Sequence, residues 1–288
     1  MDMQYTNIKF GTAGWSYKDW EGIVYGRKEN GLATVSSILD CVEINNTFYR
    51  IPEEKMVSRW LERTEEKKEF SFLLKLWKGF THEAEWHRND EKAFQRTCLL
   101  MKEGDRLGAV LAQFPFYFTR EPEHEKRVWK LSEAFRDYGI FFEFRHISWL
   151  EPDFLDRLKT WGGHICNIDI PGGKKTVNTM AEAWGGKGYL RLHGRNRKAW
   201  FSKDAGRDEK YDYLYSEQEL EAIIQRLKEI AKKANSTFVI ANNHFRGKAV
   251  ANALQMKASV TGRNVEVPEQ MIYEYPVLKR ISHTQSLF

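Results

Sequence analysis

The sequence predicts a single (β/α)8 TIM-like barrel with parallel strands and a long loop after the seventh strand. The chain has 288 residues, a length typical of one such barrel. Eight short apolar runs recur, with starts about 24 to 48 residues apart, and helical patterns fill most of the intervals. Alternating strands and helices indicate a parallel sheet covered by helices, and eight units favour closure into a barrel.

Each expected strand is an apolar run that ends in polar or aromatic residues. In chain order the runs are Ile8–Trp15, Cys41–Phe48, Phe70–Trp77, Leu107–Pro115, Ile140–His146, His164–Ile170, Gly188–Gly194 and Thr237–His244. No G-x-G-x-x-G motif follows the first run, which argues against a doubly wound dinucleotide-binding fold.

Helical patterns between these runs begin at recognisable start signals. Pro52, Pro122 and Pro152 lie at the starts of three of them, where proline is well tolerated. The segment Ser216-Glu217-Gln218-Glu219 has the form of a capping box and precedes a run with apolar residues on one face. Residues 247–260 give the last clear helix.

The chain reads as one domain over residues 1–288, because no linker rich in proline, glycine or serine divides it. We expect the barrel core over about residues 8–260 and a C-terminal extension over residues 261–288. The interval before the last strand is the longest, and its surplus residues lie between Gly194 and Tyr215. The long loop is therefore expected there.

Composition narrows the class of protein. The net charge of +5 is compatible with an anionic ligand but too small to indicate nucleic acid binding by itself. The sequence has neither a signal peptide pattern nor an apolar stretch long enough to span a membrane. Cys41, Cys98 and Cys166 each lie among apolar residues, which suggests buried, reduced thiols and a cytoplasmic protein.

The polar strand ends form the candidate site, because the C-terminal ends of barrel strands build the active sites of such proteins. Alternation along a strand places Glu143 with Arg145 on one face, and Arg191 with His193. The charged residues expected to point into the barrel mouth are Lys75, Arg145, Arg191, Glu43, Glu143 and Asp169. Three cations against three carboxylates favour an ion-paired polar floor, an arrangement that also occurs as pure barrel architecture.

Each candidate residue has an expected role. Glu43 or Glu143 would act as a general base, and His193 is the alternative proton donor or acceptor. Ligand binding is expected from Lys75, Arg145 and Arg191, which would hold an anion. The other candidate ligand-binding residues are the polar Asn45, Gln113, Asp169, Asn242 and Asn243 and the wall-forming Trp15, Trp77 and Trp149.

Two further chemistries are weighed at the same strand ends. His82, His146, His193 and His244 could join the carboxylates as metal ligands, but no metal-binding spacing is present and three cations disfavour a divalent ion. We expect no obligatory metal, without excluding one, and see no motif for an organic cofactor. The opposed carboxylates Glu43 and Glu143 also fit a glycosidase, although on unusual strands.

The expected long loop is basic and aromatic over Arg195–Lys203. Together with Lys174-Lys175 it could form a cationic rim for a phosphate or for single-stranded nucleic acid, or it is simply a solvated loop. Tyr211, Tyr213 and Tyr215 follow it, and they either fold over the mouth as a lid or pack beside the barrel.

The strand ends together resemble a known family. The matching pieces are Gly11-Thr12-Ala13-Gly14-Trp15-Ser16-Tyr17 with Trp20, Val42–Tyr49, Gln113-Phe114-Pro115, Glu143–His146 with Ser148-Trp149, Arg191–Gly194 and Asn242-Asn243. They look like domain-of-unknown-function family 72, also called YecE-like, from about Ile8 to Val260. The resemblance implies a TIM-like barrel and brings no activity with it. Ala241 departs from the family, where Phe is more usual.

The residues support three hypotheses of function. The first is a pocket for a small anionic or phosphorylated ligand, with acid/base chemistry if the protein is an enzyme, as a hydrolase, lyase or isomerase. The second is a nucleic-acid-binding or phosphodiester-processing protein, since the fold is also similar to endonuclease IV barrels. The third is a non-catalytic sensor or scaffold.

Overall fold

The computed structural model describes residues 5–83, 86–172, 177 and 180–283. Its strands form one sheet in the order β6-β5-β4-β3-β2-β1-β9-β8-β7, and every pair is parallel. The strands are β1 (Ile8–Ala13), β2 (Cys41–Ile44), β3 (Ser71–Lys75), β4 (Leu107–Gln113), β5 (Ile140–Glu143), β6 (His164–Ile165), β7 (Asn167–Asp169), β8 (Gly186–Leu192) and β9 (Ala234–Ala241). The predicted parallel barrel is confirmed, because all eight expected runs hold strands.

The sheet has nine strands instead of eight because the sixth expected strand is interrupted. Only Cys166 separates β6 from β7, and its amide still donates to the Phe142 carbonyl over 2.9 Å. β6 pairs with β5 and β7 pairs with β8, so the two ends of the sheet are neighbours in the chain. The segment His164–Asp169 thus bridges the two ends and nearly closes the barrel.

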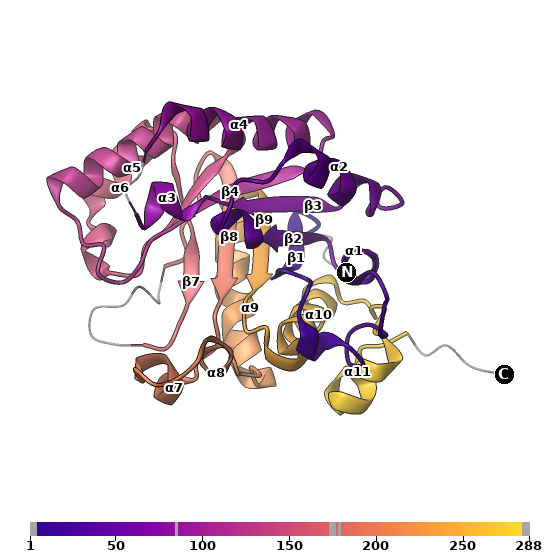
Figure 1. Ribbon diagram of the computed structural model, residues 1–288. Helices are drawn as coiled ribbons and strands as arrows, with labels where there is room; N and C mark the ends of the chain where they lie inside the picture. Colours follow the sequence, from indigo (N-terminus) through magenta and orange to yellow (C-terminus); the bar gives the residue numbers. More distant parts are fainter. Residues whose placement is uncertain (1–4, 84–85, 173–176, 178–179, 284–288) are drawn as a thin grey trace.

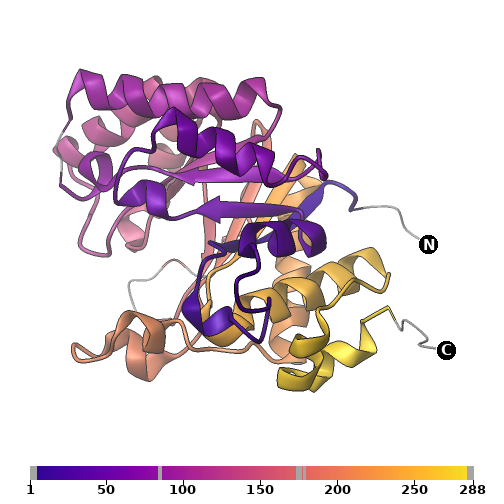
Figure 2. The ribbon, with the colours of Figure 1, turned by 45° about the vertical axis from the view of Figure 1, so that its right-hand side comes forward.

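Helices surround the strands on the outside (Figures 1 and 2). The α-helices are α1 (Gly31–Ile38), α2 (Glu54–Glu62), α3 (Lys78–Thr81), α4 (Arg88–Glu103), α5 (Pro122–Phe135), α6 (Pro152–Thr160), α7 (Arg197–Phe201), α8 (Arg207–Lys210), α9 (Glu217–Lys232), α10 (Lys248–Thr261) and α11 (Glu269–Glu274). Short 3-10 turns are η1 (Lys18–Trp20), η2 (Asn46–Phe48), η3 (Arg136–Tyr138), η4 (Ile147–Leu150), η5 (Phe245–Gly247) and η6 (Pro276–Arg280). Among the described residues, no helix combines the length and apolar character needed to cross a bilayer.

The helix start signals act largely as the sequence predicts. Pro122 and Pro152 are the first residues of α5 and α6, while Pro52 lies two residues before α2. The capping box at α9 forms in full: the Ser216 hydroxyl accepts from the Glu219 amide, and the Glu219 carboxylate accepts from the Ser216 amide over 2.9 Å. The segment expected as a long loop contains the two short helices α7 and α8.

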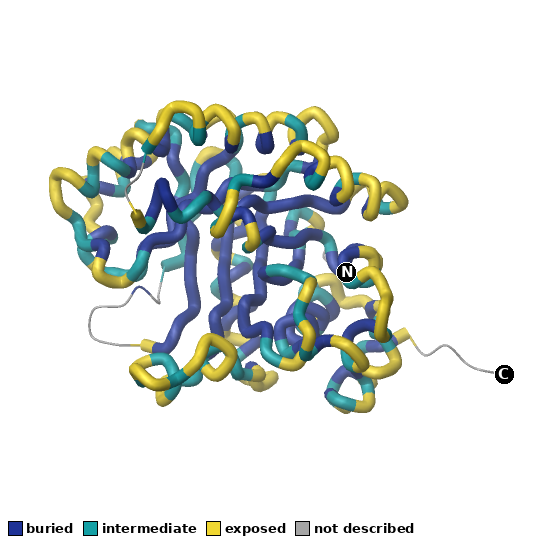
Figure 3. The backbone as a smooth tube through the Cα atoms, viewed as in Figure 1, coloured by how far each residue is buried: buried dark blue, intermediate teal, exposed yellow. Residues whose placement is uncertain are grey.

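The core has an inner and an outer layer, separated by the strands, which are buried along most of their length (Figure 3). The inner cluster takes an apolar side chain from each segment of the barrel, such as Leu73, Leu111, Phe141 and Ile240. Outer clusters join the opposite faces of the strands to the helices. The C-terminal helices α11 and η6 belong to one of these, so the extension completes the outer layer beside α1 and α10.

Candidate functional site

A layer of charged side chains lies inside the barrel, above the apolar inner cluster. Two of its members follow inward apolar residues by two positions, as strand alternation requires: Glu143 follows Phe141 and Arg191 follows Tyr189. Glu43 is in register with Leu73 of the neighbouring strand, and Arg191 with Ile240. The strand ends therefore bring these charges to one place, as the sequence predicts.

Arg191 is the centre of this layer. Its Nη2 donates to Glu43 Oε1 over 2.7 Å, and its Nη1 makes an ion pair with Glu143 Oε2. The Tyr189 hydroxyl donates to the other oxygen of Glu43 over 2.6 Å, and Arg145 Nε donates to Glu143 Oε1 over 3.0 Å. Arg191 and both carboxylates are fully buried, so each buried charge has its counter-charge within hydrogen-bond distance.

The network keeps Glu143 ionised. Burial alone would raise the pKa of Glu143, but Arg191, and after it His193 and Arg145, outweigh burial and hold that pKa well below its usual range. Burial would likewise lower the pKa of Arg191, but Glu143 and Glu43 raise it. A carboxylate that is so strongly stabilised in its charged form is a weak proton acceptor.

His193 is held neutral beside this network. Burial lowers the pKa of His193 to about 4, against the opposing effect of Glu143. Its Nδ1 lies 3.0 Å from the amide nitrogen of Asn242, and its Nε2 lies 3.4 Å from Glu143 Oε2. Since Asn242 donates to Nδ1, the hydrogen-bond network assigns the ring proton to Nε2, directed at Glu143.

A pocket of about 120 Å³ opens directly above the charged layer. Its lining includes four cationic side chains, Lys75, Arg145, Arg191 and Arg207. The other lining residues are Tyr17, Asn45, Phe48, Tyr49, Gln113, Tyr211, Asn242 and His244. None of the described lining residues is acidic, because Glu43 and Glu143 lie beneath the pocket with their oxygens directed at Arg191, Tyr189 and Arg145.

Lys75 lies in this lining at the end of β3. Its ammonium nitrogen is 4.3 Å from the ring centroid of Phe48, a cation–π contact. Burial, and after it Arg191, lower the pKa of Lys75 to about 7, although Glu43 and Glu143 act in the opposite direction. Lys75 therefore exchanges its proton near neutral pH.

Most of the predicted site residues meet as expected. The structure brings Asn45, Lys75, Gln113, Arg145, Arg191 and Asn242 into the pocket lining. Glu43, Glu143 and His193 lie directly beneath it and are fully buried. The three residues predicted to transfer protons are thus separated from the pocket by the lining side chains to which they are bonded.

Asp169 is placed elsewhere, and the expected balance of three cations against three carboxylates is wrong. Asp169 is in register with the outward Leu192, whereas Ile168 is in register with Arg191 and faces the interior. Its carboxylate accepts from Arg195 Nη2 over 2.7 Å and from the Tyr215 hydroxyl over 2.8 Å. The interior layer therefore has more cations than carboxylates.

The turn that brings Arg195 to Asp169 requires glycine. Gly194 has φ of +87°, and a Cβ there would lie 2.7 Å from the Tyr213 side chain. Asn243 also leaves the pocket: its side-chain nitrogen donates to the Tyr213 carbonyl over 2.8 Å and to Asn252 Oδ1 over 2.9 Å. The segment that follows β8 is thus held against the barrel at two points: Arg195 is bonded to Asp169 of β7, and the Tyr213 carbonyl is bonded to Asn243 after β9.

None of the three predicted tryptophans lines the pocket. Trp149 is buried under the helices, where its indole nitrogen donates to the Phe118 carbonyl over 2.7 Å. Trp15 packs edge-on against Trp60, and Trp77 against Phe80. The aromatic wall comes instead from Tyr17, Phe48, Tyr49 and Tyr211.

Two lining residues come from the long segment after β8. Arg207 is the first residue of α8, and Tyr211 directly follows that helix. Of the three tyrosines weighed as a lid, Tyr211 reaches the pocket, while Tyr215 packs in the outer core with α9. In the basic loop, Trp200 lies against His193 at 6.0 Å and under the Arg145 guanidinium at 5.5 Å. Lys174 and Lys175 lie outside the described residues.

The metal site weighed from the sequence is not supported by the geometry of the described residues. Within it, no three His, Cys, Asp or Glu side chains are close enough together to hold a metal ion. His82 bonds to the Thr81 hydroxyl over 2.9 Å, and His146 to the Ser148 hydroxyl over 2.9 Å.

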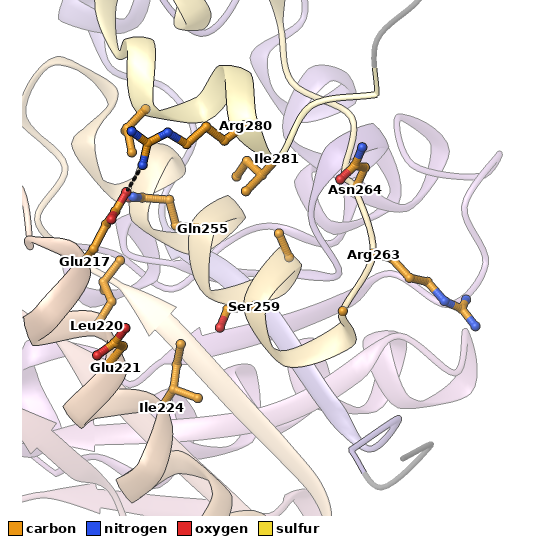
Figure 4. Close-up of a pocket in the computed structure, with 13 residues that line it drawn as sticks. Glu217, Leu220, Glu221, Ile224, Gln255, Ser259, Arg263, Asn264, Arg280 and Ile281 are labelled. Carbon is orange, nitrogen blue, oxygen red and sulfur yellow. Dashed lines mark hydrogen bonds and ion pairs between the residues drawn. The ribbon is translucent and has the colours of Figure 1, made fainter. Parts of the chain in front are cut away.

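A second and larger hollow, of about 310 Å³, lies on the outside between α9, α10 and the C-terminal segment (Figure 4). No strand contributes to its lining. Its charged pair, Glu217 and Arg280, lies 3.3 Å apart and is largely exposed. We call this hollow the outer groove.

A nearly closed ring of parallel strands surrounded by helices defines the class of protein as a TIM-like barrel, and the charged pocket lies at its strand ends. Comparison with known proteins adds the family. A sequence model of the family described as "Protein of unknown function DUF72" matches residues 9–273. The chain therefore belongs to the DUF72 family.

Individual relatives agree with this assignment. The UPF0759 protein YunF of Bacillus subtilis is 30% identical over 267 residues, which cover 86% of this chain and 93% of that protein. The solved structure of a DUF72 family protein from Thermotoga maritima has a TM-score of 0.78 and 29% identity, and the match covers 88% of this chain and 98% of that one. A DUF72 family protein from Enterococcus faecalis also has a TM-score of 0.78, with 26% identity, 90% of this chain and 97% of that one covered.

Proposed function

We propose that the pocket at the strand ends binds a small anionic ligand, such as a phosphorylated or carboxylated metabolite. The observation that carries this proposal is the charge of the lining: three arginines and a lysine, and no described acidic residue. The two interior carboxylates are already engaged by Arg191 and Arg145, and the exposed Asp208 pairs with Arg207. An anion would therefore meet an excess of positive charge.

The size of the pocket also supports a small ligand. A volume of about 120 Å³ is well below the range of about 300–1,000 Å³ typical of sites for larger organic ligands. The amides of Asn45, Gln113 and Asn242 share the lining and offer both donors and acceptors. Such groups would orient the polar atoms that accompany the anionic group.

For Glu43 and Glu143 we propose a positioning role in place of the base expected from the sequence. Each is fully buried and bonded to Arg191, and the pKa of Glu143 is held low. Their contribution would be to hold the Arg191 guanidinium at the pocket floor without losing charge. His193 would support the network from the side, since its Nε2 lies 3.4 Å from Glu143 Oε2.

Thermal unfolding with and without inorganic phosphate tests the proposal. At a phosphate concentration about 100 times the dissociation constant, we expect stabilisation of about 2.7 kcal/mol. The Arg207→Gln variant should show a smaller gain, because it removes a lining cation that is largely exposed and dispensable for folding. Arg280→Gln in the outer groove is the matched control and should respond like the wild type. Equal responses of both variants, or the same gain with chloride at equal ionic strength, would contradict an anion site here.

A second candidate, binding of single-stranded nucleic acid, is favoured by the surface of α7. Phe201 is 56% exposed, and the Arg197 guanidinium lies 5.9 Å from its ring. Aromatic rings beside cations are typical of such surfaces. An oligonucleotide should then bind with an affinity that falls steeply as salt increases, and Phe201→Ser should weaken it. No binding at low salt would reject this candidate.

We further propose a cytoplasmic location. Cys41, Cys98 and Cys166 are all buried free thiols, as the sequence suggests. Burial raises the pKa of each thiol, which keeps it protonated and unreactive. Retention of all three thiols in protein isolated under non-reducing conditions would support this location, and oxidised cysteines would contradict it.

A further inference from the structure

Lys75 differs from the other three cations of the pocket. Arg145, Arg191 and Arg207 each make an ion pair with a carboxylate. Among the residues that the structure describes, no carboxylate lies within ion-pair distance of the Lys75 nitrogen, whose recorded partner is the ring of Phe48. A lysine left without a counter-charge in a pocket lining is available to a ligand.

The surroundings of Lys75 favour the uncharged amine. The charged and titratable groups that face it are Glu43 on β2, His82 after α3, Glu143 on β5, Arg145 after β5 and Arg191 on β8. Both carboxylates are already engaged by arginine. Burial and the neighbouring arginines lower the pKa of Lys75 to about 7, so the free amine is far more accessible at neutral pH than in an ordinary lysine.

A free amine is a nucleophile toward aldehydes and ketones. The same small pocket contains Arg145, Arg191 and Arg207, which suit an anionic group. A ligand of a few non-hydrogen atoms that placed its anionic group on these arginines would keep its other end within the lining that Lys75 shares. The arrangement thus combines an anchor for charge with a reactive nitrogen.

We propose that Lys75 forms an imine with the carbonyl carbon of a small aldehyde or ketone that carries an anionic group. This inference rests on the anion pocket proposed above and names the substrate class of that pocket. Anionic carbonyl compounds include 2-oxo acids and phosphorylated ketoses and aldehydes, which share the chemistry that the pocket would recognise.

The reaction balances without a cofactor. The lone pair of Lys75 Nζ attacks the carbonyl carbon, the new C–N bond forms, and the electrons of the C=O double bond move to oxygen. The oxygen takes up two protons, both derived from the lysine ammonium, and leaves as water when the C=N bond forms. Ammonium and carbonyl thus give a protonated imine and water, and hydrolysis reverses the step.

Reductive trapping tests the proposal on the full chain. Wild-type protein is incubated at pH 7 with glyoxylate or dihydroxyacetone phosphate and with cyanoborohydride, which reduces an imine to a stable secondary amine. Peptide mass mapping then locates the adduct. An ordinary lysine with a pKa near 10.4 has roughly a thousandfold less free amine at this pH. We therefore expect Lys75 to be labelled at least tenfold more than exposed lysines such as Lys130.

Variants and a neutral probe complete the experiment. Lys75→Arg keeps the positive charge but cannot form an imine, so the adduct should disappear. Lys75→Met gives the same readout if the arginine variant does not fold. Dihydroxyacetone, which lacks the phosphate, should label Lys75 at least tenfold less than dihydroxyacetone phosphate.

The two proposals fail in different ways. If the anionic probes stabilise the wild-type protein against heat but leave Lys75 unlabelled, the imine is rejected and the anion pocket stands. If the probes neither stabilise the protein nor label Lys75, both proposals are rejected. Labelling that simply follows the exposure of each lysine also overturns the imine.

Discussion

The pocket at the strand ends and the outer groove differ both in volume and in how deeply their charged side chains are buried. The groove is more than twice as large, but its charges lie on the surface, with Glu217 and Arg280 largely exposed. The smaller pocket is built on an arginine and two carboxylates that are withdrawn from water. Buried charges are costly unless they are paired, whereas exposed pairs contribute little. The burial of charge, and not volume, therefore distinguishes the candidate site.

The largest expected effect, and the most direct test of this comparison, comes from removing Arg191. In Arg191→Met, Glu43 and Glu143 lose their common partner and remain buried, so we expect the free energy of unfolding to fall by about 3–5 kcal/mol. Urea unfolding at pH 7 measures this. A loss below about 1 kcal/mol would show that the charged layer is as loosely held as the groove. If the variant does not fold, Glu43→Gln, which keeps the shape and one hydrogen bond, gives the same comparison at smaller cost.

The next effect is a loss of stability as the pH falls. Burial lowers the pKa of His82, His164, His193 and His244 to about 4 in the fold, against about 6.5 in an unfolded chain. The stability that these groups contribute is fully present above pH 6.5 and is lost as the pH falls toward 4, because only the unfolded chain takes up the protons.

Unfolding free energies between pH 7 and pH 4.5 check this second prediction. Each such histidine contributes a slope of up to about 1.4 kcal/mol per pH unit. His193→Gln should make the profile flatter by one such contribution. An unchanged profile would mean that the pKa of His193 is the same in the folded and in the unfolded chain, so that burial does not hold its ring neutral.

The smallest expected effect is a loss of stability in a variant of the outer groove. Arg280→Gln breaks its ion pair with Glu217, and because that pair is exposed we expect a loss of no more than about 0.5–1 kcal/mol. The same urea experiment applies, with Glu217→Gln as the reverse variant. A loss as large as that for Arg191→Met would remove the distinction between the two regions.

The sequence was sufficient for the barrel and for much of the site, since strand ends can be recognised by where apolar runs become polar. It was not sufficient to predict which residues of a strand point into the barrel and which point outward. Alternation groups Asn167 with Asp169 but does not say which group points inward, and Arg195 draws Asp169 to the outside.

The remaining wrong or missed predictions concern residues in the connections between strands and helices. Trp149 follows the end of β5 in sequence, but the 3-10 turn η4 carries it under the helices. Arg207 and Tyr211 lie between β8 and α9, and no local pattern indicates that they return to the mouth. Their placement depends on tertiary contacts that a single sequence does not encode in any repeating pattern.

The interruption of the sixth strand leaves a seam in the wall of the barrel. β5 and β6 are in register only at Phe141 with His164 and Phe142 with Ile165, whereas β8 and β9 run together along almost their full length. On the β7 side of this seam, Arg226 of α9 donates from Nη2 to the Ile168 carbonyl over 2.9 Å. Amide hydrogens near Cys166 should therefore exchange with solvent sooner than those of β8 and β9, and the ring of strands should part there first.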